Sequence, residues 1–147
     1  MRISREQMFM DIAEIVAKRS ACLRNNVGAV IVNKENNIVA IGYNGVPPGI
    51  PHCTSECCTK GCSIAIHAED NAIRRMPKNY DLFDNYRIFC TVSPCLNCAR
   101  LIVEREDIKT LYYRYDYRDK AGLTYLLING IRVYKILTGG IINEEEI

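Results

Sequence analysis

Two short motifs constrain this chain most, because their side chains suit one metal ion and must therefore meet in space. The first is H-A-E at residues 67–69, and the second is P-C-L-N-C at residues 94–98. Zinc at a catalytic site takes three protein ligands and keeps a fourth position for water. The motifs offer three such ligands: His67, Cys95 and Cys98. The carboxylate of Glu69 is left over and is predicted to carry protons.

The spacing within the second motif favours a helix. Cys95 and Cys98 lie three residues apart, so on a helix they share one face. Pro94 suits the start of that helix, where a missing N–H costs nothing. The partial positive charge of a helix N-terminus favours the thiolate that a metal needs. Residues 70–75 should continue from His67 as another helix, so that two N-termini point at one metal.

Simpler interpretations exist for each motif alone. A single C-x-x-C is often a redox pair or half of a structural zinc site, and a lone histidine is more often a core residue. Neither explains both motifs in one short chain. The joint pattern H-x-E and P-C-x-x-C is the signature of zinc nucleobase deaminases, in which the glutamate is an acid and base and not a ligand.

The composition excludes several other classes. The chain of 147 residues is long enough for one domain, over residues 1–147, with a sizeable core. Its 19 basic and 17 acidic residues leave a net charge of +2, which argues against strong nucleic-acid binding. No window approaches the roughly 18 apolar residues of a membrane span, and the N-terminus lacks a signal peptide. We therefore expect a cytoplasmic protein, or one in the host cytoplasm if its source is viral.

Periodicity predicts an α/β protein. A capping-box pattern at residues 4–7 opens a first helix over about residues 4–20. Strands are predicted at residues 27–32, 38–43, 86–92, 108–113 and 131–136, and further helices at about 95–105 and 120–128. The expected architecture is a three-layer, five-stranded mixed sheet with helices on both faces. An acidic tail at about residues 138–147 is expected to fray.

A second group of cysteines lies in the long loop before His67. Its members are Cys53, Cys57, Cys58 and Cys62, and Cys22 at the end of the first helix is a further candidate. A closed four-ligand zinc site would order such a loop. The alternative is a flexible loop with spare thiols. Cys90 lies in a predicted strand and is interpreted as a small buried hydrophobic residue.

The chain resembles the deoxycytidylate (dCMP) deaminases of the cytidine and deoxycytidylate deaminase superfamily. The matching segments are C-L-R at 22–24, V-G-A-V-I-V at 27–32, G-Y-N-G at 42–45, H-C at 52–53, H-A-E-D-N-A-I at 67–73 and S-P-C-L-N-C at 93–98. They cover most of residues 20–135. The zinc motifs fit the whole superfamily, whereas G-Y-N-G followed by a cysteine-rich loop is typical of the dCMP members.

The resemblance implies the zinc-dependent hydrolysis of dCMP to dUMP and ammonia, which supplies dUMP for thymidylate synthesis. It implies the three-layer fold and a homo-oligomer, usually a homohexamer. Members are commonly activated by dCTP and inhibited by dTTP, and Mg²⁺ would accompany such a nucleotide effector.

The resemblance also implies roles for single residues. Asn44 matches a position that contacts the nucleotide sugar, and Tyr117 matches an aromatic residue near the substrate. Ala68 and Ser93 lie in the matched motifs and are predicted to bind substrate. Four cysteines match the second, structural zinc of many microbial and phage members: Cys22, Cys53, Cys58 and Cys62, with Cys57 as the alternative to Cys58.

Recognition of a substrate phosphate requires cations. Arg24, together with Asn26, is the candidate pair, and the alternative is a solvated arginine at a helix end.

Other functions remain open from the sequence. The substrate could be free cytidine or deoxycytidine, dCTP, or a base in a polynucleotide, although the last predicts a basic groove that the charge balance disfavours. A different class is an inactive, zinc-stabilised nucleotide-binding module. Glu69 argues against it, because a structural metal site has no use for the extra carboxylate.

Overall fold

The structure is a computed structural model that describes residues 1–52, 54, 64–78 and 81–146. Its helices and strands follow in the order α1 (Arg5–Ala17), β1 (Gly28–Val32), β2 (Ile38–Tyr43), α3 (Ala68–Arg74), β3 (Tyr86–Val92), α4 (Leu96–Arg105), β4 (Ile108–Tyr115), α5 (Ala121–Ile128), β5 (Arg132–Ile136) and β6 (Ile142–Glu144). Every predicted strand is present within two residues of its expected bounds, because alternating and β-branched residues mark strands locally.

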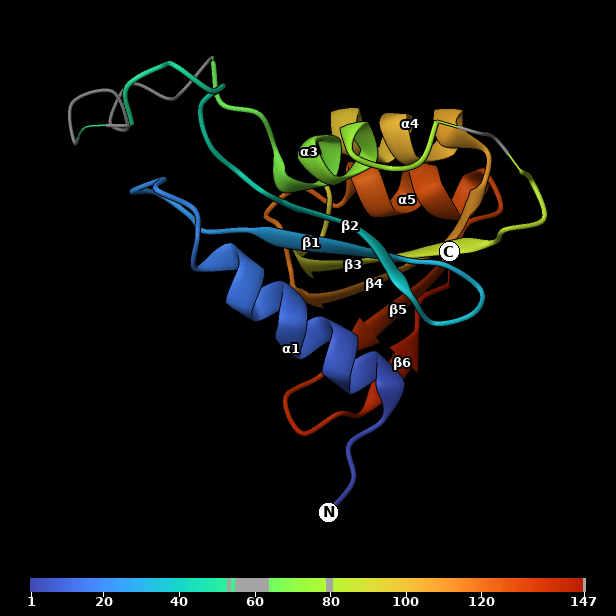
Figure 1. The fold of residues 1–147 in the computed structure, drawn as a ribbon. Helices are drawn as coiled ribbons and strands as arrows, with labels where there is room; N and C mark the ends of the chain where they lie inside the picture. Colours follow the sequence, from blue (N-terminus) through green and yellow to red (C-terminus); the bar gives the residue numbers. More distant parts are fainter. Residues whose placement is uncertain (53, 55–63, 79–80, 147) are drawn as a thin grey trace.

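The strands form one mixed sheet in the order β2-β1-β3-β4-β5-β6. β1 pairs antiparallel with β2 and with β3, whereas β3, β4 and β5 run parallel. The parallel pairs are joined by α4 and α5, as crossover connections require. Figure 1 shows α1 below the sheet and α3, α4 and α5 above it, which confirms the predicted three layers.

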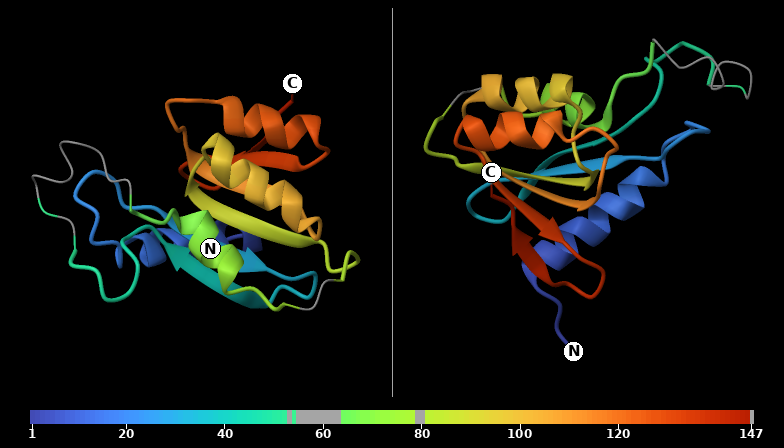
Figure 2. Two further views of the ribbon diagram at one scale, coloured as in Figure 1. Left: turned by 90° about the horizontal axis from the view of Figure 1, so that it is seen from above. Right: turned by 180° about the vertical axis from the view of Figure 1, so that it is seen from behind.

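Each face of the sheet buries its own apolar cluster. On the α1 side, Phe9, Met10 and Ala13 pack with side chains of β1 and β3. On the other side, α3, α4 and α5 cover a larger cluster that includes Ile102 and Leu126, both fully buried. In Figure 2 these three helices lie across the same face of the sheet in both views. The two motifs of the predicted metal centre, at the starts of α3 and α4, therefore lie in the same helical layer.

The prediction of five strands was wrong at the C-terminus. Residues that were expected to fray form β6, which pairs antiparallel with β5 through Ile136↔Ile142 and Tyr134↔Glu144. The chain reverses at residues 139–140, two glycines with φ of +94° and +87°, a conformation that glycine adopts readily. The segment escaped prediction because β6 has only three exposed residues and no apolar alternation.

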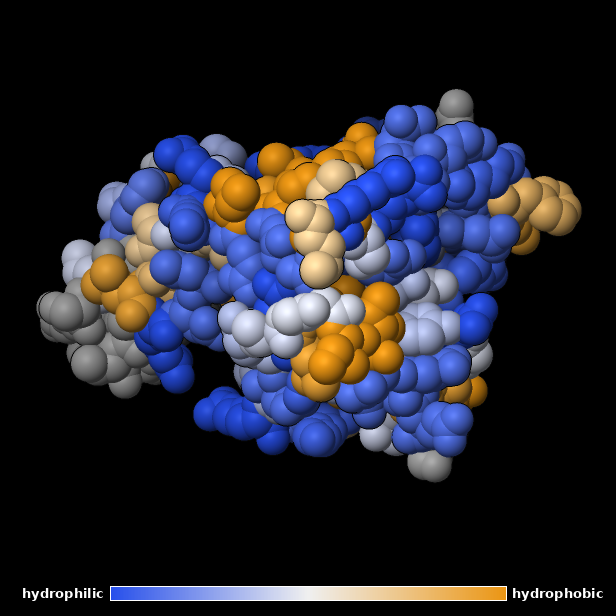
Figure 3. Space-filling model, turned by 90° about the horizontal axis from the view of Figure 1, so that it is seen from below, coloured by the Kyte–Doolittle hydropathy of each residue, from blue (hydrophilic) through white to orange (hydrophobic). Residues whose placement is uncertain are grey.

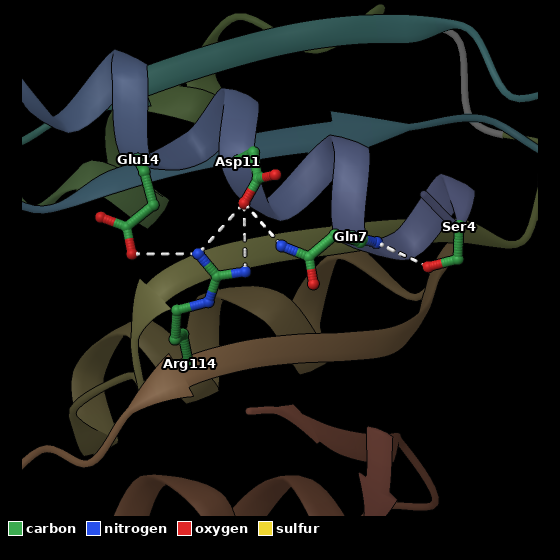
Figure 4. Close-up of polar contacts among 5 residues, drawn as sticks. All are labelled: Ser4, Gln7, Asp11, Glu14 and Arg114. Atoms are coloured by element: carbon green, nitrogen blue, oxygen red, sulfur yellow. Dashed lines mark hydrogen bonds and ion pairs between the residues drawn. The ribbon is translucent and has the colours of Figure 1, made fainter. Parts of the chain in front are cut away.

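Helix α1 begins where the capping pattern places it but ends three residues earlier than expected, at Ala17. The Ser4 side chain accepts a hydrogen bond from the Gln7 backbone N–H at 3.0 Å. Arg114 on β4 ties the helix to the sheet, because its guanidinium lies 3.2 Å from Asp11 and 3.4 Å from Glu14 (Figure 4).

The face that carries α1 and the C-terminal hairpin shows an apolar area among hydrophilic residues (Figure 3). The exposed large apolar side chains of α1 and of the strand β6 with its preceding residue are Met8, Ile15, Ile141 and Ile142. None of the helices that the structure describes is long and apolar enough to span a membrane.

Candidate metal centre and active site

The structure brings the three predicted metal ligands together at two helix starts. His67 is the N-cap of α3, Cys95 is the N-cap of α4, and Cys98 follows in the first turn of α4. His67 Nδ1 lies 3.4 Å from Cys95 Sγ and 3.3 Å from Cys98 Sγ. The His67 side chain does not cap its own helix, and Cys95 hydrogen-bonds to Cys98 and His67, so the three donor groups already converge on one point.

Tight packing of the neighbouring elements sets the position of these two helix starts. A Cβ atom on Gly122 of α5 would lie 2.2 Å from the Pro94 carbonyl oxygen and 2.9 Å from the Cys95 carbonyl carbon. A Cβ atom on Gly42 of β2 would lie 2.4 Å from the Ala68 carbonyl oxygen in α3. Only glycine permits such approaches, so the sheet and α5 press directly on the backbone that carries the ligands.

The donor set fits zinc at a catalytic site. One imidazole nitrogen and two thiol sulfurs lie within 4.8 Å of one another. A zinc ion held by these three groups would keep a further position for water. Hydrogen bonds from Cys98 and then from His67 lower the pKa of the Cys95 thiol to about 4, which favours the thiolate form that a metal needs. The hydrogen bond to Cys95, with burial, raises the pKa of Cys98. A metal ion would displace that remaining proton.

Glu69 lies in the first turn of α3 and is only 4% exposed. Burial raises the pKa of its carboxyl group above the ordinary value. A carboxyl group whose pKa is shifted toward neutrality can both accept and return a proton, as a general acid and base must.

A cavity of about 470 Å³ opens beside the metal ligands. Its volume is within the roughly 300–1,000 Å³ typical of small-molecule sites. The predicted residues on its wall are Cys22, Arg24, Asn44, His67, Ala68, Glu69, Ser93, Cys95 and Tyr117. Asn26 is not part of this wall; Asn25 lines it instead. Cys98 is buried at 3% exposure behind the wall.

One wall of the cavity is the segment after β4, and Ser93 holds it in place. The Tyr117 backbone N–H donates to Ser93 Oγ at 2.7 Å, and the Ser93 N–H donates to the Tyr115 carbonyl oxygen at 2.9 Å. The Ser93 hydroxyl therefore fixes the position of Tyr117 at the cavity, which is a role that the sequence analysis did not foresee.

Sequence reasoning also missed Arg118. This arginine lines the cavity, and its guanidinium carbon lies 5.9 Å from the centre of the Tyr117 ring. Asp116, on the same wall, accepts a hydrogen bond from Lys135 at 2.7 Å, so its charge is already paired. In the sequence, the only hint of this role is that Arg118 directly follows Tyr117, the aromatic residue predicted to lie near the substrate. The parallel pairing of β3 with β4 is what places Arg118 beside the motif at residues 94–98.

The side chain of Asn44 is engaged at both ends. Its Oδ1 accepts from the Val27 N–H at 2.8 Å, and its Nδ2 donates to the Asn25 carbonyl oxygen at 2.8 Å. The amide therefore ties two loops together at the cavity wall.

The predicted structural zinc site lies almost entirely outside the described residues. This holds for four of its candidate ligands: Cys53, Cys57, Cys58 and Cys62. Cys22 is described and lies half-buried as a free thiol at the cavity wall.

Known proteins resemble this chain over most of its length. A family model for the cytidine and deoxycytidylate deaminase zinc-binding region matches residues 3–114. ComE operon protein 2 of Bacillus subtilis is 41% identical over 120 residues, which cover 80% of this chain and 62% of that protein. The deoxycytidylate deaminase of Saccharomyces cerevisiae is 33% identical over 144 residues, which cover 90% of this chain and 45% of that enzyme. The chain thus spans about half the length of these two relatives.

Among solved structures, the dCMP deaminase of cyanophage S-TIM5 in complex with dCMP and dUMP has the same fold. The two structures match with a TM-score of 0.82 at 34% sequence identity. The match covers 92% of this chain and 98% of the phage chain.

Proposed function

Because the chain belongs to the cytidine and deoxycytidylate deaminase family, we propose that it hydrolyses dCMP to dUMP and ammonia. One observation carries the proposal: a single cavity adjoins a three-ligand centre and is lined by a buried spare carboxylate and two arginines. The likeness to the cyanophage enzyme that binds dCMP and dUMP supports the choice of substrate. The product dUMP would supply thymidylate synthesis.

The chemistry follows from the positions of these groups. Zinc held by His67, Cys95 and Cys98 would lower the pKa of a water molecule toward about 7. Glu69 would take a proton from the attacking water and deliver it to N3 of the cytosine ring, as the water oxygen forms its bond to C4. The same carboxylate then mediates proton transfer to the amine as the C4–N bond breaks. One water is consumed and one ammonia is released.

We assign recognition of the 5′-phosphate to Arg24 and Arg118. Both line the cavity, and Arg24 has no hydrogen bond or ion pair within the part of the chain that the structure describes. Lys135 neutralises the nearby Asp116, so that carboxylate does not compete for the arginines. A phosphate dianion would give both guanidiniums charge-assisted hydrogen bonds. Asn26 is exposed outside the wall, which makes it the weaker partner for Arg24.

The decisive assay measures ammonia release from dCMP, dCTP, deoxycytidine and single-stranded DNA in parallel, with zinc-loaded protein. We expect the highest kcat/KM for dCMP. Deoxycytidine lacks the phosphate, dCTP carries two further phosphates, and single-stranded DNA requires a basic track that the net charge of +2 does not favour. A higher kcat/KM for deoxycytidine than for dCMP would reject the nucleotide as the substrate. Release of no ammonia from any of the four would favour an inactive binding module.

Further properties belong to the same proposal. A second zinc would bind Cys22 with three cysteines of the loop before α3, and the enzyme would act in the cytoplasm as a homohexamer. The exposed apolar side chains of α1 and of the C-terminal hairpin support contacts between copies (Figure 3). Activation by dCTP, inhibition by dTTP and binding of Mg²⁺ with such effectors complete the expected regulation.

A further inference from the structure

The segment between α1 and β1 carries Arg24, one of the two arginines that line the cavity. Residues 21–26 form neither helix nor strand, and all but Cys22 are exposed. Arg24 nevertheless lines the cavity. An exposed segment without regular structure has few contacts to hold it. Among the described residues, the bonds at its two ends set the position of its arginine, and the zinc proposed at Cys22 would add one further tie.

Asn44 supplies the bonds at the far end of this segment. Besides the two side-chain bonds to Val27 and Asn25, its backbone N–H donates to the Val27 carbonyl oxygen at 3.2 Å. Figures 1 and 2 show the segment and the chain that follows β2 at the same end of the sheet. Asn44 thus anchors the residues that directly follow Arg24.

Ser20 supplies the bonds at the near end. Its hydroxyl donates to the Asn44 carbonyl oxygen at 2.8 Å and accepts from the Cys22 N–H at 3.2 Å. Ser20 is 9% exposed and is not part of the cavity wall. The two ends of the segment therefore converge on one residue, Asn44.

We infer that Ser20 and Asn44 form a clasp that positions Arg24 at the cavity and thereby sets the preference for a phosphorylated substrate. This inference rests on the proposed function, because it takes the phosphate of dCMP as the group that Arg24 meets. Ser20 is a positioning residue in this arrangement: it contacts the segment and Asn44 and touches no substrate. Asn44 acts through its bonds to residues 25 and 27, whatever contact it also makes with the sugar.

Ser20 allows a test that separates positioning from direct binding. The experiment compares kcat and KM for dCMP and deoxycytidine in the wild type, Ser20→Ala, Arg24→Gln and the double variant. Loss of neutral hydrogen bonds by Ser20→Ala should lower kcat/KM for dCMP by roughly five- to tenfold, mainly through KM. For deoxycytidine, kcat/KM of Ser20→Ala should stay within about twofold of the wild-type value, because this substrate has no phosphate for Arg24 to bind. Asn44→Ala should lower the dCMP-to-deoxycytidine ratio further.

The double variant shows whether the clasp acts through the arginine. If it does, Ser20→Ala adds little to the loss already caused by Arg24→Gln, since coupled residues are not additive. Losses that multiply, or equal losses for both substrates in Ser20→Ala, would overturn the inference, provided that circular dichroism and zinc content match the wild type. If Ser20→Ala fails to fold, Ser20→Cys and Asn44→Asp, which keeps the Val27 acceptor, provide the same comparison. A wild type without preference for dCMP would instead reject the proposed substrate.

Discussion

Glu69 is surplus to the proposed metal coordination by His67, Cys95 and Cys98, and that makes it the most informative single residue of the candidate site. It follows the proposed ligand His67 by two positions, its side chain is buried, and that burial raises its pKa. Burying a carboxyl group costs free energy unless the group is paired or protonated. A residue kept in such a place is a candidate for proton transfer.

Replacing Glu69 with glutamine should preserve zinc content and lower kcat by about 10²–10⁴-fold, because the isosteric amide cannot carry the proton. Steady-state assays with dCMP and metal analysis of the same samples give both quantities. Glu104→Gln, at an exposed position on α4, serves as the matched control and should keep the wild-type rate. Retention of more than about half the activity by Glu69→Gln would contradict the acid and base role.

At the scale of elements, helix α5 contributes no predicted metal ligand, but its packing determines the position of the ligand Cys95. Gly122 brings α5 against the carbonyl groups of Pro94 and Cys95, so that the backbone of one helix supports the start of another. Loss of a group that orients a metal ligand typically lowers metal affinity about 10–100-fold.

Gly122→Ala should therefore weaken zinc binding by about 10–100-fold, even though alanine is the better helix former. The added methyl group would clash with the backbone of Pro94 and Cys95, so the start of α4 must shift relative to His67. Competition with a zinc-binding dye, followed in the apoprotein, measures the affinity without reference to turnover. Gly45→Ala is the control, since a Cβ atom there meets nothing within 4 Å. Equal zinc affinity in the two variants would show that the packing of Gly122 against Pro94 and Cys95 does not determine the position of the ligand.

At the scale of the whole molecule, the sheet joins segments that the chain order separates. The metal motifs start two helices on one face, while the first connection, the loop after β2 and the segment after β4 close the cavity around them. Only the parallel pairing of β3 with β4 sets Tyr117 and Arg118 next to Ser93.

Protein purified without added metal should contain two zinc ions per chain, since the cysteine-rich set is separate from the catalytic set. Elemental analysis measures the ratio. Cys53→Ser with Cys62→Ser should reduce it to one and lower the melting temperature, because a closed zinc site contributes folding free energy directly. A ratio of one in the wild type, unchanged in the double variant, would exclude the structural site.

The sequence alone determined the ligand chemistry and most of the elements. His67, Cys95, Cys98 and Glu69 are recognisable because ligand type and short spacing are local properties. The strands are recognisable because hydrophobic periodicity is also local. The sequence therefore sufficed to predict a mixed sheet with helices on both faces.

Tertiary structure decided what depends on partners far along the chain. The strand β6 exists because a glycine turn returns the tail to β5, and Arg118 reaches the cavity because β4 pairs with β3. Asn44 looks like an ordinary turn residue until its bonds to residues 25 and 27 are seen. Such contacts leave no short-range pattern, because the free energy that forms them comes from burial and pairing between distant segments.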